Sequence, residues 1–178
     1  MNSNTVYLRA FEPEDYLTSL PWRNDDRIWS QLGGCKYFVS SAYEKKWIEE
    51  AIFDSRNINL AICLKEDDRY IGNVRITNID NINRSGTSHI LIGDRSCWNR
   101  GVGAEAYRLL LDYAFNQRGF HRIDALVLEG NTASLKMHQK CGYRIEGTLR
   151  ESVFKDGHWQ NQVHLSILES DFRQAQHA

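Results

Sequence analysis

The stretch CWNRGVGAEAYRLLLDYAF, residues 97–115, contains residue types that bind an anion. Arg100 is followed by Gly101 and Gly103, and the residues after them have the apolar spacing of an amphipathic helix over 101–117. Free N–H groups and the dipole at a helix N-terminus attract negative charge, and glycines let the backbone approach a phosphate without an intervening Cβ. The spacing therefore predicts a phosphate site made by backbone N–H groups at the start of this helix.

Two other kinds of nucleotide-binding loop have a similar glycine pattern. GVGAEA fits the loose dinucleotide-binding pattern GxGxxA, and Asp124 lies about twenty residues later, where an acid that binds ribose is found. A dinucleotide-binding fold requires further βαβ units, but only one strand and one short helix follow before the terminal hairpin. A P-loop is excluded because no GK[ST] follows the glycines. A glycine-rich turn that only packs a strand closely against a helix remains open.

A second polar segment, NTASLKMHQKCG at residues 131–142, has the end signals of a short helix. Asn131 is a natural N-cap, and the closing glycine suits the position after the helix. Ser134, His138 and Cys141 are three and four residues apart, so they share one helix face. An imidazole can donate a proton at neutral pH, so His138 is a candidate for acid–base chemistry, and a histidine that only fills space or faces solvent is the open alternative. A nucleophilic Cys141–His138 pair that passes through an acyl-enzyme is the rival interpretation.

His89 is the second histidine with a predicted place near the phosphate loop. It lies in TSHILIGD, residues 87–94, which reads as a strand that ends just before the loop. Alternation places His89 on the same face as Leu91 and Gly93. An imidazole with an ordinary pKa of about 6.5 is a reasonable base there, and a half-exposed strand residue without chemistry is the open alternative.

The rest of the sequence predicts the elements that position these residues. Apolar alternation or continuity predicts strands at 5–10, 59–64, 70–79, 87–94, 122–128, 143–155 and 159–168, with the polar turns KEDDR and KDGHW between two pairs of them. Residues from Pro13 to about 54 read as helical, with Ser40 or Ser41 as a cap inside this region. The order of strand, helices, three strands, helix, strand, helix and two strands predicts a mixed α/β domain.

Composition narrows the classes of function. The 178 residues are 42% hydrophobic and 25% charged with a formal net charge of -1, so the sequence is typical of a globular protein and has no basic field for nucleic acid. No apolar run is long enough for a membrane span, and the N-terminus lacks the features of a secretory signal. The four cysteines form no CxxC pair and the six histidines have no metal-binding spacing. These features predict a cytoplasmic protein with free thiols and no metal.

Two coupled motifs give the sequence its family resemblance. The loop NRGVGA between a strand and a helix, then a strand, then Asn131, Ser134, Lys140 and GY, resembles the GNAT superfamily of N-acetyltransferases. The likeness is firm over residues 58–145 and follows the order of elements throughout the chain. The tail EGTLRESVFKDGHWQNQVHLSILESDF, with WRND near residue 22, is similar to the branch that contains ribosomal-protein N-terminal, spermidine and amino-sugar acetyltransferases.

The resemblance implies a fold and a co-substrate. The fold is one α/β domain over residues 1–178, with a mixed, mostly antiparallel sheet of six or seven strands, flanking helices and a splayed parallel pair, 87–93 and 122–128. Acetyl-CoA is expected with its pantetheine arm between the splayed strands. Its pyrophosphate is expected on the backbone N–H groups of Arg100, Gly101, Val102, Gly103 and Ala104. A backbone N–H among Leu91, Ile92 and Gly93 is expected to polarise the thioester carbonyl.

Three further residues are carried over from the family pattern. Asn131 matches the asparagine whose side chain bonds the pantetheine arm, although a plain N-cap is an equally good explanation of this residue. Lys140 either meets a coenzyme phosphate or is a solvated cation at a helix end. Trp98 stands where the family often has a glutamine or arginine, and it cannot replace that polar contact.

The resemblance also implies a mechanism in which two residues differ from the family pattern. Many relatives have a tyrosine that protonates the departing thiolate and a strand glutamate that activates the amine, and this chain has His138 and His89 at those positions. A lysine-like amine is neutral in only about one molecule in 2,500 at pH 7, so such an acceptor needs a base. The hypothesis is direct transfer in a ternary complex, with His89 as the base and His138 as the acid.

The acceptor is less defined by the sequence. The region 11–54 is rich in aromatic and acidic residues, which either attract a cation or form core and solvated faces. Its acidic cluster is too sparse for a polyamine specialist, so a primary amine on a small molecule, an amino sugar or a protein N-terminus is expected. A homodimer is an open expectation. The alternative function is an acyl-CoA-binding sensor or interaction module without turnover.

Overall fold

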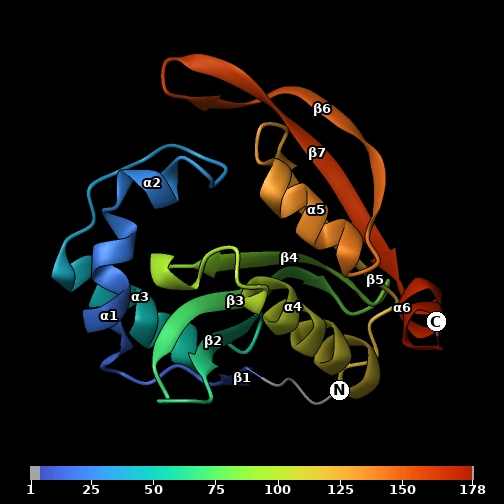
Figure 1. The fold of residues 1–178 in the computed structure, drawn as a ribbon, viewed down its shortest axis with the longest axis horizontal. Helices are drawn as coiled ribbons and strands as arrows, with labels where there is room; N and C mark the ends of the chain where they lie inside the picture. Colours follow the sequence, from blue (N-terminus) through green and yellow to red (C-terminus); the bar gives the residue numbers. More distant parts are fainter. Residues whose placement is uncertain (1–4, 178) are drawn as a thin grey trace.

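The computed structural model describes residues 5–177 and is built on one seven-stranded sheet in the order β1-β2-β3-β4-β5-β7-β6 (Figure 1). The strands are β1 (Val6–Arg9), β2 (Ile58–Leu64), β3 (Tyr70–Asp80), β4 (Ser85–Ile92), β5 (Arg122–Leu128), β6 (Arg144–Lys155) and β7 (His158–Leu168). The helices are α1 (Asp15–Arg23), α2 (Asp26–Trp29), α3 (Ser41–Phe53), α4 (Val102–Asp112), α5 (Thr132–Lys140) and α6 (Glu169–His177). Short turns η1 (Arg95–Cys97) and η2 (Tyr113–Gln117) flank α4.

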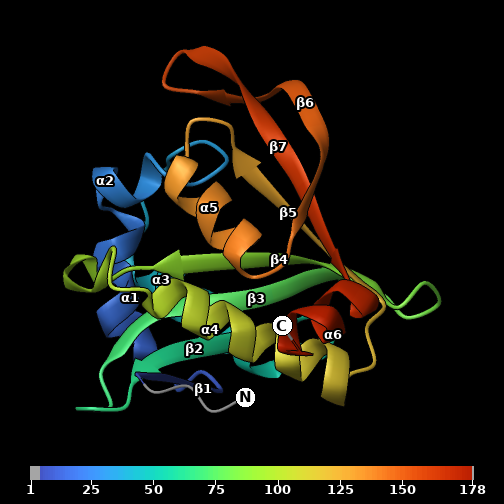
Figure 2. The ribbon, with the colours of Figure 1, turned by 45° about the vertical axis from the view of Figure 1, so that its right-hand side comes forward.

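The predicted mixed sheet is confirmed, and the parallel pair is splayed. β4 and β5 are paired only from Ser85–Arg122 to Thr87–Asp124, whereas every other neighbouring pair is antiparallel. Beyond Thr87 the two strands separate, and β5, β7 and β6 form a second wing that rises away from β4 (Figures 1 and 2). The sheet therefore contains a fork whose apex lies at Thr87 and Asp124.

The helices cover the two faces of the sheet separately (Figure 2). The face with α4 is the larger core, where Val74, Ile76, Tyr107 and Leu110 are buried together. On the opposite face, α1, α2 and α3 pack over Ala61 and Cys63 around a cluster of aromatic rings. Because strand side chains alternate, Ser88 of β4 faces α4, whereas its neighbour His89 faces the side of α1 and α3.

Three local predictions differ from the structure. The helical region before residue 54 is divided into α1, α2 and α3, because residues 30–40 form a loop that contains Gly33 and Gly34. The predicted helix 101–117 is α-helical only to Asp112, and η2 completes it as a π-helical turn. The C-terminal helix α6 was not predicted, since Phe172 is its one buried apolar anchor among the described side chains.

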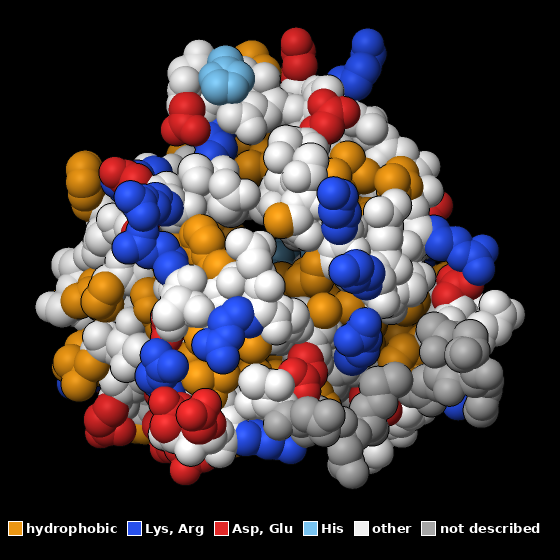
Figure 3. Space-filling model, in the orientation of Figure 1, with side chains coloured by type: hydrophobic (Ala, Val, Ile, Leu, Met, Phe, Trp, Pro, Cys, Tyr) orange, Lys and Arg blue, Asp and Glu red, His pale blue; other side chains and the backbone are white. Residues whose placement is uncertain are grey.

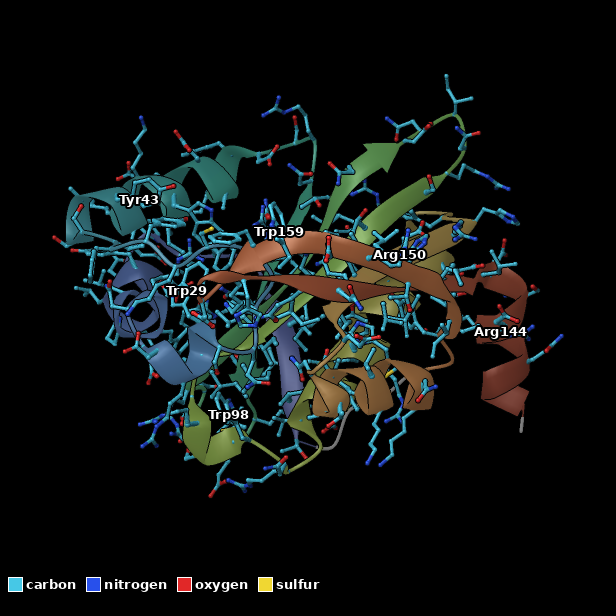
Figure 4. All side chains as sticks on the ribbon, turned by 90° about the horizontal axis from the view of Figure 1, so that it is seen from above. Trp29, Tyr43, Trp98, Arg144, Arg150 and Trp159 are labelled. Atoms are coloured by element: carbon cyan, nitrogen blue, oxygen red, sulfur yellow. The ribbon has the colours of Figure 1, made fainter. Side chains whose placement is uncertain are left out.

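The loop between α2 and α3 joins the two wings at the open end of the fork. Lys155 of β6 is buried, and its Nζ donates to the carbonyl oxygens of Trp29 and Gly34 at 2.5 and 3.4 Å. Asn131 donates its Nδ2 to the Gln31 carbonyl at 2.9 Å. Figure 4 shows the tip of the β6–β7 hairpin, marked by Trp159, reaching toward Trp29.

Two features of the described residues bear on the protein class. No helix is both long and apolar enough to cross a membrane in this part of the chain. The four cysteines are unpaired, and only Cys35 is exposed. The prediction of a single domain over residues 1–178 stays a prediction.

Candidate active site

The loop before α4 has the geometry of an anion site. Gly101 adopts φ +81° and ψ −7° as the N-cap of α4, and no atom lies within 4 Å of where its Cβ would be. The first intrahelical hydrogen bond runs from the N–H of Glu105 to the Gly101 carbonyl at 3.1 Å. The N–H groups of Val102, Gly103 and Ala104 therefore precede the helical ladder and point out of the helix end. A left-handed glycine followed by free N–H groups forms a nest that suits a phosphate.

Cations and a hollow accompany this loop. Arg100 is exposed in the loop, and Lys140 is exposed at the end of α5. Figure 3 shows a narrow hollow near the centre of this face, with hydrophobic side chains inside and Lys and Arg side chains on both sides. Gly103 has a packing role as well, because a Cβ there would lie 3.3 Å from the sulfur of Met137 in α5.

The end of β4 presents only some of the predicted N–H groups to the fork. Gly93 donates its N–H to the Ile71 carbonyl at 2.9 Å, so this amide is already used by β3. In an antiparallel ladder alternate residues bond to the same neighbour, so the Leu91 amide also faces β3. The amides of Ile90 and Ile92 point into the fork instead. Of the three residues predicted to polarise a carbonyl, Ile92 has the suitable orientation.

Trp98 anchors the loop to the strand. Its Nε1 donates to the Ile92 carbonyl at 2.8 Å, and its ring packs against the apolar cluster on the α1 side of the sheet. Gly93 is required in the same region because a Cβ there would lie 1.9 Å from the ring of Trp22. The polar atom of Trp98 is thus engaged within the protein, and its contribution to a ligand site is indirect.

Asn131 is confirmed as the N-cap of α5. Its Oδ1 accepts from the N–H of Ser134 at 3.0 Å, while Nδ2 is bonded to Gln31 as described above. Both polar atoms of the side chain are therefore engaged. A contact between Asn131 and a pantetheine arm stays a prediction that requires the Gln31 bond to be exchanged.

His138 is buried in a hydrogen-bond network at the fork. Its Nδ1 lies 2.8 Å from the Ser134 carbonyl, and its Nε2 lies 3.0 Å from the hydroxyl of Tyr107. Tyr107 lies 2.6 Å from Ser88 Oγ, which also contacts the Tyr143 hydroxyl at 2.8 Å and donates to the Asp124 carbonyl at 2.9 Å. Sequence reasoning missed Tyr107, Ser88 and Tyr143, because only the packing of α4 on the sheet brings them together.

The number of protons available in this network constrains the protonation state of His138. The Ser134 carbonyl can only accept, so it requires a proton on Nδ1. Ser88 gives its one proton to Asp124, so the contact between Ser88 and Tyr107 requires the proton of Tyr107. Nε2 must then also carry a proton, and all contacts are filled at once only by the imidazolium. Burial opposes this form and lowers the pKa of His138. The network therefore supports a form of His138 that can release a proton.

His89 lies on the opposite face of the sheet and remains exposed. Its Nε2 lies 2.8 Å from Thr77 Oγ1, and its Cα partner across the ladder is Arg75. Partial desolvation and the positive charge of Arg75 lower the pKa of His89 to about 4. His89 is therefore neutral at pH 7 but has a low affinity for a proton.

A His–Asp pair that sequence reasoning missed lies on the same face as His89. His164 of β7 places its Nε2 at 2.7 Å from Asp124 Oδ1, and Asp124 is the Cα partner of Thr87 at the fork apex. Arg122 also pairs with Asp124 at 2.7 Å and with Glu146 at 3.1 Å. A carboxylate that holds one imidazole nitrogen leaves the other free to accept a proton. Only the strand register reveals this pair, because residues 124 and 164 are forty positions apart.

Cys141 is unsuited to act as a nucleophile. Its thiol donates to the Ala104 carbonyl at 3.6 Å, and burial raises its pKa to about 11. A thiol needs a lowered pKa to react as a thiolate at neutral pH. The geometry therefore argues against an acyl-enzyme on this residue. Within residues 5–177 no group of three or more His, Cys, Asp or Glu side chains could hold a metal ion.

Comparison with known proteins places this geometry in a family. Residues 5–144 match the family model described as an acetyltransferase (GNAT) domain, which is more than half of the chain. The chain belongs to the GNAT acetyltransferase family. It is an acetyl-CoA-dependent N-acetyltransferase, and the alternative of a binding module without turnover is not favoured.

Relatives of this acetyltransferase align over almost its whole length. The probable N-acetyltransferase YjcK of Bacillus subtilis (strain 168) is 29% identical, and the alignment covers 98% of this chain and 99% of that one. The spermidine N(1)-acetyltransferase of Escherichia coli (strain K12) is 23% identical, with 96% and 90% covered. The crystal structure of spermidine N-acetyltransferase from Vibrio cholerae in complex with CoA and spermine superposes with a TM-score of 0.87 at 25% identity, covering 94% and 98%.

The loop of this acetyltransferase fits the co-substrate that the family uses. Open space outside Gly101, N–H groups without helical acceptors and the exposed Arg100 suit a diphosphate. The fork beyond Thr87 leaves the N–H groups of Ile90 and Ile92 without a partner strand. When bound, acetyl-CoA supplies the acetyl thioester. The residues just described are those that would hold it.

Proposed function

We propose that this acetyltransferase moves an acetyl group directly to a primary amine in a ternary complex, with its acid and its base on opposite faces of the fork. The observation that carries this proposal is the division of polar residues at the apex. His138, Tyr107 and Ser88 lie on the α4 face, whereas His89 and His164 lie on the other. An amine can then approach from one face while the leaving group receives its proton from the other.

His138 is the proposed acid. Its imidazolium fills every contact in the network, and burial disfavours the charged ring. The proton on Nε2 is the one to be released, because the Tyr107 hydroxyl can turn to donate to this nitrogen whereas the Ser134 carbonyl at Nδ1 can only accept. Tyr107 orients that nitrogen, and Ser134 fixes the other. This assignment extends the sequence-based hypothesis by naming the groups that position the ring.

The base is assigned to His164 with Asp124. His89 was the sequence-based hypothesis and stays a candidate, but its lowered pKa makes it a weak acceptor of a proton from an amine. His164 places its Nε2 at 2.7 Å from Asp124 Oδ1, which orients the ring and leaves Nδ1 available to the amine. Both side chains face the side from which the amine approaches.

The experiment measures thiol release from acetyl-CoA with a broad panel of primary amines and with the variants H138A, H164A and H89A. Loss of a general acid or base lowers kcat by about 10²–10⁴, so H138A and H164A are expected to fall in that range while the Kd for CoA is unchanged. H158A, which removes an exposed hairpin histidine, is the control. Full turnover in H138A and H164A would overturn the assignments, and parallel initial-rate lines would overturn direct transfer.

The acceptor is proposed to be a small-molecule amine, an amino sugar or a protein N-terminus. Relatives include proteins named spermidine N(1)-acetyltransferases, which supports a small-molecule amine. A homodimer also stays a proposal. It is supported by the exposed edge strand β6, along which Ile145 and Leu149 remain accessible. The unpaired cysteines support a reducing cytoplasm as the compartment.

A further inference from the structure

An open pocket lies on the face of the sheet that carries His89. Its volume is about 1260 Å³, and it is bounded by the second half of α3, the loop before α1 and strands β2 and β3. Arg75, Asn59 and Trp47 line its inner end, while Glu12, Glu49 and Glu50 line it from the exposed segments around it. The cation is therefore inside and the acids are at the rim.

Arg75 has no counter-ion among the described residues. Its Nε donates to Asn59 Oδ1 at 2.7 Å, and its guanidinium lies 5.2 Å from the ring centre of Trp47. Within residues 5–177 no ion pair includes Arg75, and its side chain donates a hydrogen bond only through Nε. Desolvation, together with the charge of Arg23, lowers the pKa of Arg75. A partly buried cation without a partner is costly, and a bound anion would remove that cost.

The neighbouring charges are already neutralised. Arg23 also lies near the Trp47 ring, 5.7 Å from its centre, but it is paired at 3.4 Å with the fully buried Glu44. Asp54, the acid whose charge acts on Arg75, is paired with the Arg56 side chain at 3.7 Å and also accepts from Asn57. The inner end of the pocket thus keeps one uncompensated positive charge.

Arg75 is directly connected to the proposed reaction centre. It is the Cα partner of His89 in the β3–β4 ladder, and both side chains face the same side. Neighbouring strands are about 4.8 Å apart, so a ligand of a few bonds can touch Arg75 and reach the fork. We infer that the acceptor amine carries an anionic group, a carboxylate or a phosphate, which pairs with Arg75 while its amine lies at the fork. This inference rests on the proposed function and adds a substrate class to it.

The inference separates this chain from a polyamine acetyltransferase. The carboxylates at the rim attract cations, but a polyamine that reached the inner end would bring an ammonium group against the Arg75 guanidinium. Like charges at close range disfavour binding at that end. Trp47 and Asn59 hold the guanidinium in place, so it cannot easily move out of the way. Spermidine is therefore expected to be a poor acceptor here, although relatives are named for it.

The test compares acceptors that differ only in their far end. 6-Aminohexanoate, 6-aminohexanol and 1,6-diaminohexane form one set, and β-alanine tests a shorter reach for the carboxylate. 2-Aminoethyl phosphate and ethanolamine form a second set, and comparing the two sets separates a preference for phosphate from one for carboxylate. For the wild type, kcat/KM is expected to be at least tenfold higher for the anionic member of a set than for its neutral or cationic partner. R75Q should remove this preference, and R75E should reverse it in favour of the diamine.

The controls keep failure of the inference distinct from failure of the proposed function. R118E makes the same charge change at an exposed site away from the pocket and should keep the wild-type preference. Melting curves and CoA affinity establish that the Arg75 variants are folded, and calorimetric binding of 6-aminohexanoate in the presence of CoA gives a second readout. If none of the amines tested supports thiol release, the proposed function is overturned. Turnover of all amines with no anionic preference, or a preference unchanged in R75Q, would overturn only the inference.

Discussion

At the residue scale, the chemistry depends on how protein surroundings change three imidazoles. His138 is buried in a network that requires both of its nitrogens to donate, whereas His89 is exposed beside a cation that opposes its charge. His164 is oriented by the Asp124 carboxylate at 2.7 Å. One side-chain type thus has three different surroundings, which allows one site to contain both an acid and a base.

His89 gives a prediction for stability against pH. Its pKa is lowered to about 4 in the fold from an ordinary value of 6.5, so the unfolded chain binds the proton more readily. The contribution of neutral His89 to the free energy of unfolding is fully present above pH 6.5 and is lost as the pH falls from 6.5 toward 4. Thermal melts of H89Q should therefore show a smaller drop in Tm over this window than the wild type. Equal slopes in H89Q, the wild type and the control H158Q would contradict the lowered pKa.

The role of a site residue was predictable from the sequence where it depends only on neighbouring residues in the chain. Asn131 as an N-cap and Gly101 at a helix start follow from neighbours in the sequence, and the structure has both. The partners of His138 and His164 were not predictable in this way. They come from α4 and β5, and contacts between distant segments depend on packing and register that periodicity does not encode.

At the element scale, the phosphate loop depends on one backbone conformation. Gly101 has φ +81°, which costs roughly 1–2 kcal/mol for a residue with a side chain, and its added methyl would enter the space outside the helix end. G101A is expected to raise the Kd for CoA by about tenfold, measured by calorimetry where both proteins are folded. G147A is the matched control, because Gly147 also has open space but no positive φ. CoA affinity unchanged in G101A would show that the anion does not bind there.

The elements themselves were largely predictable because strong apolar patterns define them. All seven strands were expected within a few residues of their observed ends, since β2 and β5 are largely apolar and β3 alternates apolar with polar residues. The loop at 30–40 and helix α6 were not expected. Both are held by contacts to distant segments, such as the packing of Phe172 on Phe115, and have weak patterns of their own.

At the scale of the whole molecule, the two wings of the sheet are joined at both ends of the fork. Three residue pairs of β4 and β5 hold the apex, and Lys155 with Asn131 holds the open end through the 30–40 loop. This arrangement sets the separation of the acid face from the base face. The hydrogen bonds at the open end should therefore affect both the free energy of unfolding and the affinity for a ligand that binds between the wings.

Replacement of Lys155 by methionine tests this bridge. The change keeps the apolar stem but removes the donor to the carbonyl oxygens of Trp29 and Gly34. The Trp29 carbonyl still accepts from the N–H of Leu32 at 3.1 Å, so K155M removes a charged donor and does not leave this acceptor bare. A hydrogen bond to a charged group contributes about 1.5–3 kcal/mol, and each kcal/mol lowers Tm by roughly 2–4 °C in a protein of this size. K155M is therefore expected to melt several degrees lower and to bind CoA more weakly, whereas K136M, at an exposed position on α5, should match the wild type. An unchanged Tm in K155M would mean that the wings are held at the apex alone.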